Sequence, residues 1–114
     1  KGDKRVLLLD GEVLGYFLRI PKKGDFRANL HQGGRFVKTT LEDNEKKIIK
    51  RVAPSLKQAG LHFVGLDLIG NFVTEINVTS PMGVREVNQI DNSQIEKKIV
   101  DWAENAAFQP YLTV

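Results

Sequence analysis

The sequence predicts an α+β domain in which helices back a mainly antiparallel sheet. Two pairs of apolar segments, residues 5–20 and 61–78, each contain a short turn with glycine. Two other segments, residues 40–60 and 93–108, have helical periodicity. The resulting order is β-β-loop-α-β-β-α. With 114 residues, 41% hydrophobic and 27% charged, the chain has the size and composition of one globular domain.

The first predicted hairpin is "RVLLLDGEVLGYFLRI", residues 5–20, with its turn at Asp10-Gly11. Both flanks are continuously apolar, so we expect these strands to be covered on both faces. Residues 21–39 follow without any period and are rich in glycine and charge. Such long stretches often serve as lids or binding loops, and local disorder is the alternative.

The pattern of residues 40–60 predicts a helix. Thr40 and Asp43 are expected to cap its start, and Gly60 is expected to end it. Pro54 lies inside this helix, so we expect a kink or two short helices. After the second strand pair, "TSPMGVREVN" is predicted to be a connection. The last helix is predicted to begin with a Ser93–Glu96 capping box. Its apolar stripe is formed by Ile95, Ile99, Trp102, Ala103 and Ala106.

Composition excludes several functions. The chain has no cysteine, which rules out disulfides, thiolate catalysis and thiolate-bound zinc. A net charge of +3 suits an anionic ligand but is too small to predict nucleic-acid binding. No apolar run approaches the ~20 residues of a membrane span, and no signal peptide is visible, so we expect a cytoplasmic protein. His31 and His62 lack catalytic companions and are expected to be structural or solvated.

Polar residues interrupt the second strand pair, "GLDLIGNFVTEINVTSP". Glu75 and Asn77 are two apart and share a face, whereas Asp67 is on the preceding strand. A two-residue turn at Gly70-Asn71 would pair Asp67 with Thr74. A three-residue loop or a bulge would instead place Asp67 opposite Glu75.

Two opposed carboxylates without a cation repel each other. Carboxylate and amide oxygens suit Mg²⁺, which keeps positions for water and phosphate oxygens. The alternative is that Asp67 and Glu75 pair with separate lysine or arginine residues at the rim of the sheet.

Four blocks occur in one order: "KGDKRVLLLDGE", "RIPKKGDFRANLHQGGR", "FVGLDLIGNFVTEINVTSP" and "GVREVN". Together they resemble the prokaryotic glutathione synthetases, which are ATP-grasp ligases, over residues 1–88. The resemblance implies the C-terminal catalytic subdomain of an ATP-grasp fold, as a fragment, residues 1–114, of a longer enzyme. It implies that ATP phosphorylates γ-glutamylcysteine and that glycine attacks the acyl phosphate, giving glutathione, ADP and phosphate, with Mg²⁺ on the nucleotide.

The resemblance also implies roles for particular residues. Mg²⁺ ligands are Asp67, Glu75 and Asn77, and catalytic arginines are Arg5 and Arg19. Guanidinium groups can bind phosphate through two parallel bonds and stabilise charge in phosphoryl transfer. Residues 20–35 are expected to form a mobile lid over the active site. Expected substrate or ATP contacts are Arg27, Asn29, Gly33, Gly34, Arg35, Ser80 and Arg85.

Two other interpretations stay open at this point. One is another ATP-grasp ligase that joins a different carboxylate and amine. The other is a non-enzymatic basic module, which the pI of about 9.3 would favour. The hairpin is one residue shorter than the family pattern, and the nucleotide-binding lysines expected upstream lie outside this sequence. We therefore expect the fragment alone to be inactive and to bind ATP weakly. Homo-oligomerisation of the full-length enzyme is compatible with the sequence.

Overall fold

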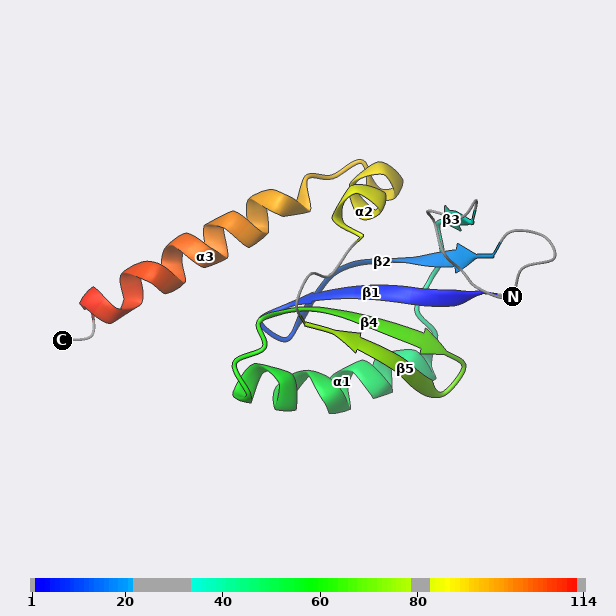
Figure 1. The fold of residues 1–114 in the computed structure, drawn as a ribbon, viewed down its shortest axis with the longest axis horizontal. Helices are drawn as coiled ribbons and strands as arrows, with labels where there is room; N and C mark the ends of the chain where they lie inside the picture. Colours follow the sequence, from blue (N-terminus) through cyan, green and yellow to red (C-terminus); the bar gives the residue numbers. More distant parts are fainter. Residues whose placement is uncertain (1, 22–33, 79–82, 113–114) are drawn as a thin grey trace.

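The computed structural model describes residues 2–21, 34–78 and 83–112 and contains one five-stranded antiparallel sheet with three helices (Figure 1). The elements are β1 (Asp3–Leu9), β2 (Glu12–Ile20), β3 (Arg35–Val37), α1 (Asp43–Gln58), β4 (Phe63–Ile69), β5 (Phe72–Asn77), α2 (Val84–Asp91) and α3 (Ile95–Leu112). The strand order is β3-β2-β1-β4-β5, so the first strand lies at the centre. The predicted α+β class is confirmed.

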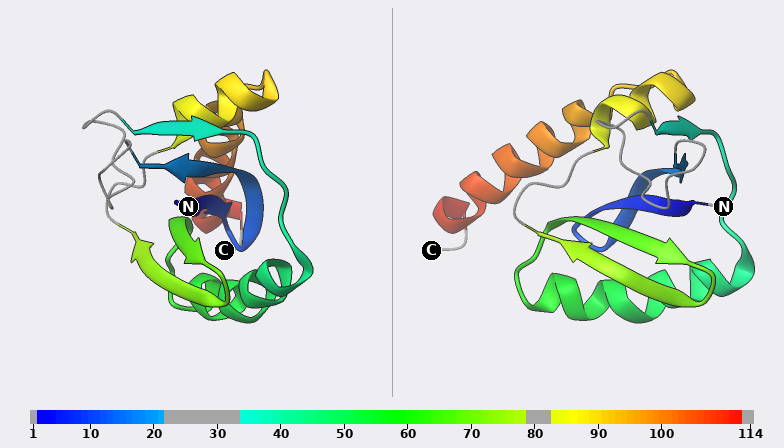
Figure 2. Two further views of the ribbon diagram at one scale, coloured as in Figure 1. Left: turned by 90° about the vertical axis from the view of Figure 1, so that its right-hand side faces the viewer. Right: turned by 45° about the vertical axis from the view of Figure 1, so that its right-hand side comes forward.

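The β1–β2 hairpin has the predicted two-residue turn. Asp10 and Gly11 both have positive φ, 51° and 84°, as a type I′ turn requires. All of residues 5–9 are buried, because α1 covers one face of the sheet and α2 the other (Figure 2). The expectation that this strand is covered on both faces is therefore confirmed for β1.

The larger part of the core lies between the sheet and α1. It contains Val6, Leu8, Ile49, Ala53, Leu56, Val64, Leu66 and Leu68. The helix begins later than predicted: Glu42 is the N-cap and forms a capping box with Glu45, so the proposed Thr40–Asp43 cap is wrong. Glu45 is held there because its carboxylate also accepts a bond from Lys4 Nζ at 2.6 Å.

Pro54 does not divide α1, which is one helix of 16 residues, so of the two predicted outcomes the pair of short helices is wrong and the kink stays a prediction. The carbonyl that proline leaves without a partner belongs to Lys50. Both residues lie on the exposed side of the helix, where water can satisfy it. Gly60 ends the helix region as predicted, with φ +80° and the paired hydrogen bonds Gly60 N–Lys57 O and Leu61 N–Leu56 O of a Schellman motif.

The opposite face is covered by α2, where the sequence had indicated only a connection. That prediction is wrong because Val84, Val87 and Ile90 are spaced to pack on the sheet, and Val87 is fully buried. The helix comes so close to β2 that a Cβ on Gly15 would overlap the Val87 side chain.

The start of α3 is also held differently from the prediction. Asn88 of α2 accepts a hydrogen bond from Ile95 N at 2.7 Å and donates one to Glu96 at 2.5 Å, so the Ser93–Glu96 capping box is not formed. Beyond this point α3 extends away from the sheet (Figure 1). Of the predicted apolar stripe, Ile95 is buried, whereas Trp102 is only half-buried. Of the rest of the predicted stripe, Ile99 is half-buried, whereas Ala103 and Ala106 are exposed.

The predicted loop over residues 21–39 contains a strand that was not expected. Within its described part, β3 pairs with the end of β2 through Leu18–Val37, Arg19–Phe36 and Ile20–Arg35. Residues 22–33 lie outside the described residues. In the described part of the chain, no helix has the length and apolar character needed to cross a membrane.

Candidate functional site

A β-bulge sets the register of the acidic strand pair. The turn has two residues, Gly70 and Asn71, but the pairing shifts beside Asp67. Thr74 is the extra residue, and its hydroxyl donates to the backbone carbonyl of Asp67 at 3.2 Å. As a result Asp67 lies opposite Glu75, which confirms the register that a shared site requires.

The same register places Asn77 opposite Gly65, two residues before Asp67. Residues two apart on a strand and residues directly paired across strands share a face of the sheet. Asp67, Glu75 and Asn77 are therefore on one face, the face that α2 partly covers and α1 does not.

Strand order brings the two predicted arginines to this face. Arg5 is the direct partner of Asp67, since β1 lies between β2 and β4. Arg19 is the second-last residue of β2 and pairs with Asp3 at the start of β1. Side chains that are far apart in the sequence thus meet at one end of the central strands.

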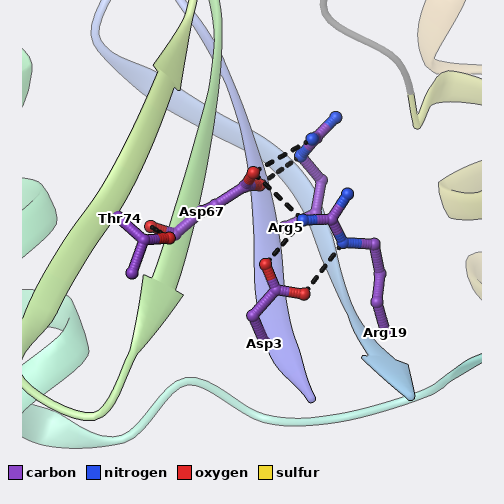
Figure 3. A network of polar contacts seen from close by, with 5 residues as sticks. All are labelled: Asp3, Arg5, Arg19, Asp67 and Thr74. Carbon is purple, nitrogen blue, oxygen red and sulfur yellow. Dashed lines mark hydrogen bonds and ion pairs between the residues drawn. The ribbon is translucent and has the colours of Figure 1, made fainter. Parts of the chain in front are cut away.

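These four side chains form an ionic network, which we call the arginine network: Asp3, Arg5, Arg19 and Asp67 (Figure 3). Arg5 donates from Nε to Asp67 Oδ1 at 2.5 Å and from Nη2 to Oδ2 at 3.2 Å. Arg19 Nη2 also reaches Asp67 Oδ2 at 3.0 Å. On its other side Arg19 binds Asp3 through Nε at 2.9 Å and Nη2 at 2.5 Å.

The centre of the arginine network, Arg5 and Asp67, is buried, whereas Asp3 and Arg19 are partly buried, and the charges of the four residues balance. Arg5 is 6% exposed and Asp67 4% exposed, so each charge depends on its partners rather than on water. Burial alone would lower the pKa of Arg19, but the hydrogen bond to Asp3 and the charge of Asp67 outweigh it. The pKa of Arg19 is therefore raised above its usual value, and the guanidinium stays charged.

The donor set on this face suits Mg²⁺. Glu75 offers an exposed carboxylate, and Asn77 an amide oxygen. A carboxylate has about four lone-pair sites. Arginine N–H groups of the described residues take three of those on Asp67, which leaves one on Oδ1. Among the described residues no group of three His, Cys, Asp or Glu side chains could hold a metal, so the amide of Asn77 is needed.

The competing interpretation was that Asp67 and Glu75 pair with separate lysine or arginine residues at the rim of the sheet. The structure agrees with it in part, and only for Asp67. Asp67 does pair with arginines, but inside the sheet and not at its rim. Glu75 lies exposed beside this pair, directly across from Asp67. Arg5, although it lies near the start of β1, is buried and is not a solvated strand end.

The remaining predicted site residues are less closely grouped. Arg35 is exposed at the start of β3, and its pairing with Ile20 puts it on the other face from Arg19. Gly34 precedes it, and Arg85 is exposed in the first turn of α2. Four predicted contacts lie outside the described residues: Arg27, Asn29, Gly33 and Ser80.

A second charged group surrounds the hairpin turn at the other end of β1. His62 Nδ1 lies 3.1 Å from Asp10 Oδ1, and Lys57 Nζ is 3.7 Å from Oδ2. The ring centroids of His62 and Trp102 are 4.7 Å apart. This turn cluster of Asp10, Lys57, His62 and Trp102 joins the hairpin to α1 and α3, which fits the structural role expected of His62.

Sequence reasoning missed Asp3. In "KGDKR" this acid is two residues before Arg5, a spacing that places both on one face of a strand. Its partner Arg19 could be found only by aligning the hairpin from the Asp10-Gly11 turn, which pairs residue 3 with residue 19 once the bulge beside Leu7 is included.

A family model described as prokaryotic glutathione synthetase, ATP-grasp domain, matches residues 1–92. The chain belongs to this family. It is 49% identical over 102 residues to a glutathione synthetase of Gloeobacter violaceus, covering 90% of this chain and 32% of that protein. It is 48% identical over 104 residues to one of Mesorhizobium japonicum, with coverages of 91% and 33%. The chain therefore spans about a third of the length of these curated relatives.

Solved structures give the same fold. The ATP-grasp ligase PsnB, complexed with a minimal precursor, superimposes with a TM-score of 0.52 over 77% of this chain and 29% of its own. The same ligase with precursor, Mg and ADP gives 0.51 over 78% and 28%. Sequence identities are 22% and 21%, so the likeness establishes an ATP-grasp fold and nothing more specific.

Proposed function

We propose that this chain is the C-terminal catalytic part of the ATP-grasp domain of a glutathione synthetase. The full-length protein would use ATP to join γ-glutamylcysteine to glycine through an acyl phosphate. The observation that carries this proposal is the family match over residues 1–92, which includes every residue of the arginine network together with Glu75 and Asn77.

Arg5 and Arg19 supply fixed positive charge in this proposal. Phosphoryl transfer from ATP to a carboxylate spreads negative charge over the transferring group, and donors already in place stabilise it. Both guanidinium groups are held through Nε and Nη2 by carboxylates. None of the Arg19 contacts with Asp3 and Asp67 uses Nη1, whose two N–H groups can serve an anionic substrate.

Asp67, Glu75 and Asn77 would hold Mg²⁺, which supplies charge neutralisation to the phosphates of bound ATP. Glu75 is exposed, so its carboxylate is accessible to a cation that arrives with the nucleotide. Asp67 keeps its arginine partners and contributes its remaining lone pair.

Residues 20–35 are proposed as a lid that keeps water from the acyl phosphate. In it Arg27, Asn29, Gly33, Gly34 and Arg35 would contact ATP or substrate, and Ser80 and Arg85 would bind the peptide or glycine. The strand pair β2–β3 would anchor both ends of such a lid, at Ile20 and Arg35. We place the enzyme in the cytoplasm, and a homo-oligomer is compatible with the proposal.

The test is a product assay on the full-length protein that contains this chain. ATP, Mg²⁺, γ-glutamylcysteine and glycine should yield glutathione, ADP and phosphate in equal amounts, measured by mass spectrometry and phosphate release. Faster turnover with another acceptor amine would indicate a different ATP-grasp ligase. No ligation with any amine, together with salt-sensitive oligonucleotide binding that survives Asp67→Asn, would favour the basic binding module.

A further inference from the structure

Thr74 interrupts the pairing of β4 with β5 immediately before Glu75. We propose that its hydroxyl makes Thr74 a positioning residue, which holds Glu75 and Asn77 on the face of Asp67 so that the three side chains can share a divalent cation. The cation rests on the proposed function, whereas the effect of the hydroxyl on the bulge does not.

The turn by itself favours a different pairing. In an unbroken ladder, the two-residue turn between the strands would pair Asp67 with Thr74. Leu66, which is buried in the core against α1, would then lie opposite Glu75 and bring it to that face. Asn77, two residues further on, would follow Glu75. The bulge therefore decides whether the three proposed ligands share a face.

Packing supplies only part of the preference for the bulge. The observed register places Ile76 opposite Leu66, on the face that α1 covers. Ile76 is nevertheless 44% exposed, because β5 lies at the edge of the sheet. Since this residue buries little apolar area, a single hydrogen bond can contribute a comparable share to the choice of register.

The hydroxyl of Thr74 provides such a bond (Figure 3). Its Oγ1 donates to the backbone carbonyl of Asp67 at 3.2 Å, from one strand to the other. A bulge disrupts the backbone ladder, and Asp67 is only 4% exposed, so its carbonyl depends on donors from the protein more than on water. The bond ties the extra residue to β4 and leaves the next residue, Glu75, opposite Asp67.

Two substitutions isolate the hydroxyl. Thr74→Val keeps the branched shape that suits a strand and removes the donor, whereas Thr74→Ser keeps the donor and removes the methyl group. Thr39→Val is the matched control. The hydroxyl of Thr39 also donates to a backbone carbonyl, that of Thr40 at 3.4 Å, but it lies between β3 and α1.

The first experiment follows the strand pairing by NMR, in labelled full-length protein without metal or nucleotide. Cross-strand NOEs between backbone protons should pair Asp67 with Glu75. The backbone amides of β5 should exchange with water roughly 2- to 10-fold faster in Thr74→Val, as expected for one lost hydrogen bond, and at the wild-type rate in Thr74→Ser and Thr39→Val. Unchanged exchange in Thr74→Val overturns the proposal. NOEs that pair Asp67 with Thr74 in the wild-type protein overturn it even if Thr74→Val fails to fold.

The second experiment measures cation binding without turnover, as Mn²⁺ binding to the full-length protein with ADP, followed by EPR. Thr74→Val should weaken Mn²⁺ binding roughly 10-fold, the effect of lost support behind a metal ligand, and Thr74→Ser should stay within about 3-fold of the wild type. Thr39→Val should match the wild type. Equal Mn²⁺ affinity in Thr74→Val and the wild type overturns the proposal. A wild type that binds no Mn²⁺ with ADP contradicts the proposed function, and the NMR measurement then decides on Thr74 alone.

Discussion

The arginine network and the turn cluster lie at opposite ends of the β1–β2 hairpin and use similar chemistry. In each, an aspartate faces more than one nitrogen-bearing side chain. They differ in burial: Asp67 is 4% exposed, whereas the side chains of Asp10 and Lys57 are 31% and 58% exposed. Removing one partner therefore leaves a buried charge without its counter-ion in the arginine network. In the turn cluster it leaves a charge that water can solvate.

That difference also separates the roles of the two sites. Buried charges are costly to assemble, so they are retained where a fixed field is useful, as in binding an anion. Exposed charges at a turn add little energy and suit the joining of neighbouring elements. We therefore propose the buried end as the place of the chemistry and a structural role, holding α1 and α3 against the hairpin, for the exposed end.

The largest expected effect comes from Asp67→Asn. It keeps the shape but leaves Arg5 and Arg19 without their shared anion, which should cost about 3–5 kcal/mol of folding free energy. Urea unfolding of the full-length protein measures it. Glu12→Gln, exposed at the start of β2, is the matched control and should change stability by less than about 0.5 kcal/mol. A loss below about 1 kcal/mol at Asp67 would contradict the difference between the two clusters.

An intermediate effect is expected at Glu45. Its carboxylate binds Lys4 at 2.6 Å and the backbone N–H of Glu42 at 2.8 Å, and the side chain is 6% exposed. Glu45→Gln can keep the bond to Glu42 but loses the charge opposite Lys4, so we expect about 1–3 kcal/mol in the same urea assay. Adding Lys4→Met should recover part of that loss, and purely additive losses would argue against a coupled pair.

The smallest effect is expected at Asp10. Burial alone would raise the pKa of this carboxyl, but the hydrogen bond from His62 and the charge of Lys57 outweigh it, so the pKa is lowered below 3.8. Because the pKa of Asp10 is lower in the folded state, its ionised carboxylate stabilises the fold at pH values above the pKa of the unfolded state. This stabilisation is lost as the pH falls through the pKa of the folded state. Asp10→Asn should cost at most about 1 kcal/mol at pH 7, and this cost should shrink as the pH falls through the folded pKa of Asp10.

The two clusters should also differ in how strongly salt changes the stability cost of removing their aspartate. Raising NaCl to 1 M should reduce the cost of Asp10→Asn, because exposed charges are screened, and should leave the cost of Asp67→Asn almost unchanged. Stability curves at two salt concentrations measure both. Equal salt sensitivity at the two aspartates would show that the arginine network is open to solvent.

Local sequence patterns predicted the hairpin at Asp10-Gly11, the paired strands β4 and β5, and the glycine stop, Gly60, that follows α1. Each of these depends on a turn or cap residue and its immediate neighbours. The partners of Asp67 could not be found in this way, because they depend on β1 inserting between β2 and β4. Nor could the bulge at Thr74, since "TEIN" is compatible with either register.

The missed helix α2 has a similar cause. Its eight residues follow Ser80, Pro81 and Gly83, which indicate a turn, and the helix is favoured by packing of Val84, Val87 and Ile90 on the sheet. The capping of α3 by Asn88 likewise joins residues of two helices. For the site, the shared face of Glu75 and Asn77 followed from period two, whereas Asp3 required the full hairpin alignment.

The most direct measurement is the turnover of the full-length Glu75→Gln protein across a Mg²⁺ titration, with γ-glutamylcysteine, glycine and ATP. The substitution keeps the shape of an exposed side chain and removes one charge opposite Asp67, so the fold should persist while kcat falls at least about 100-fold, as for a lost electrostatic contact to the reacting groups. Glu12→Gln should match the wild type. Wild-type rates for Glu75→Gln at every Mg²⁺ concentration would contradict the site.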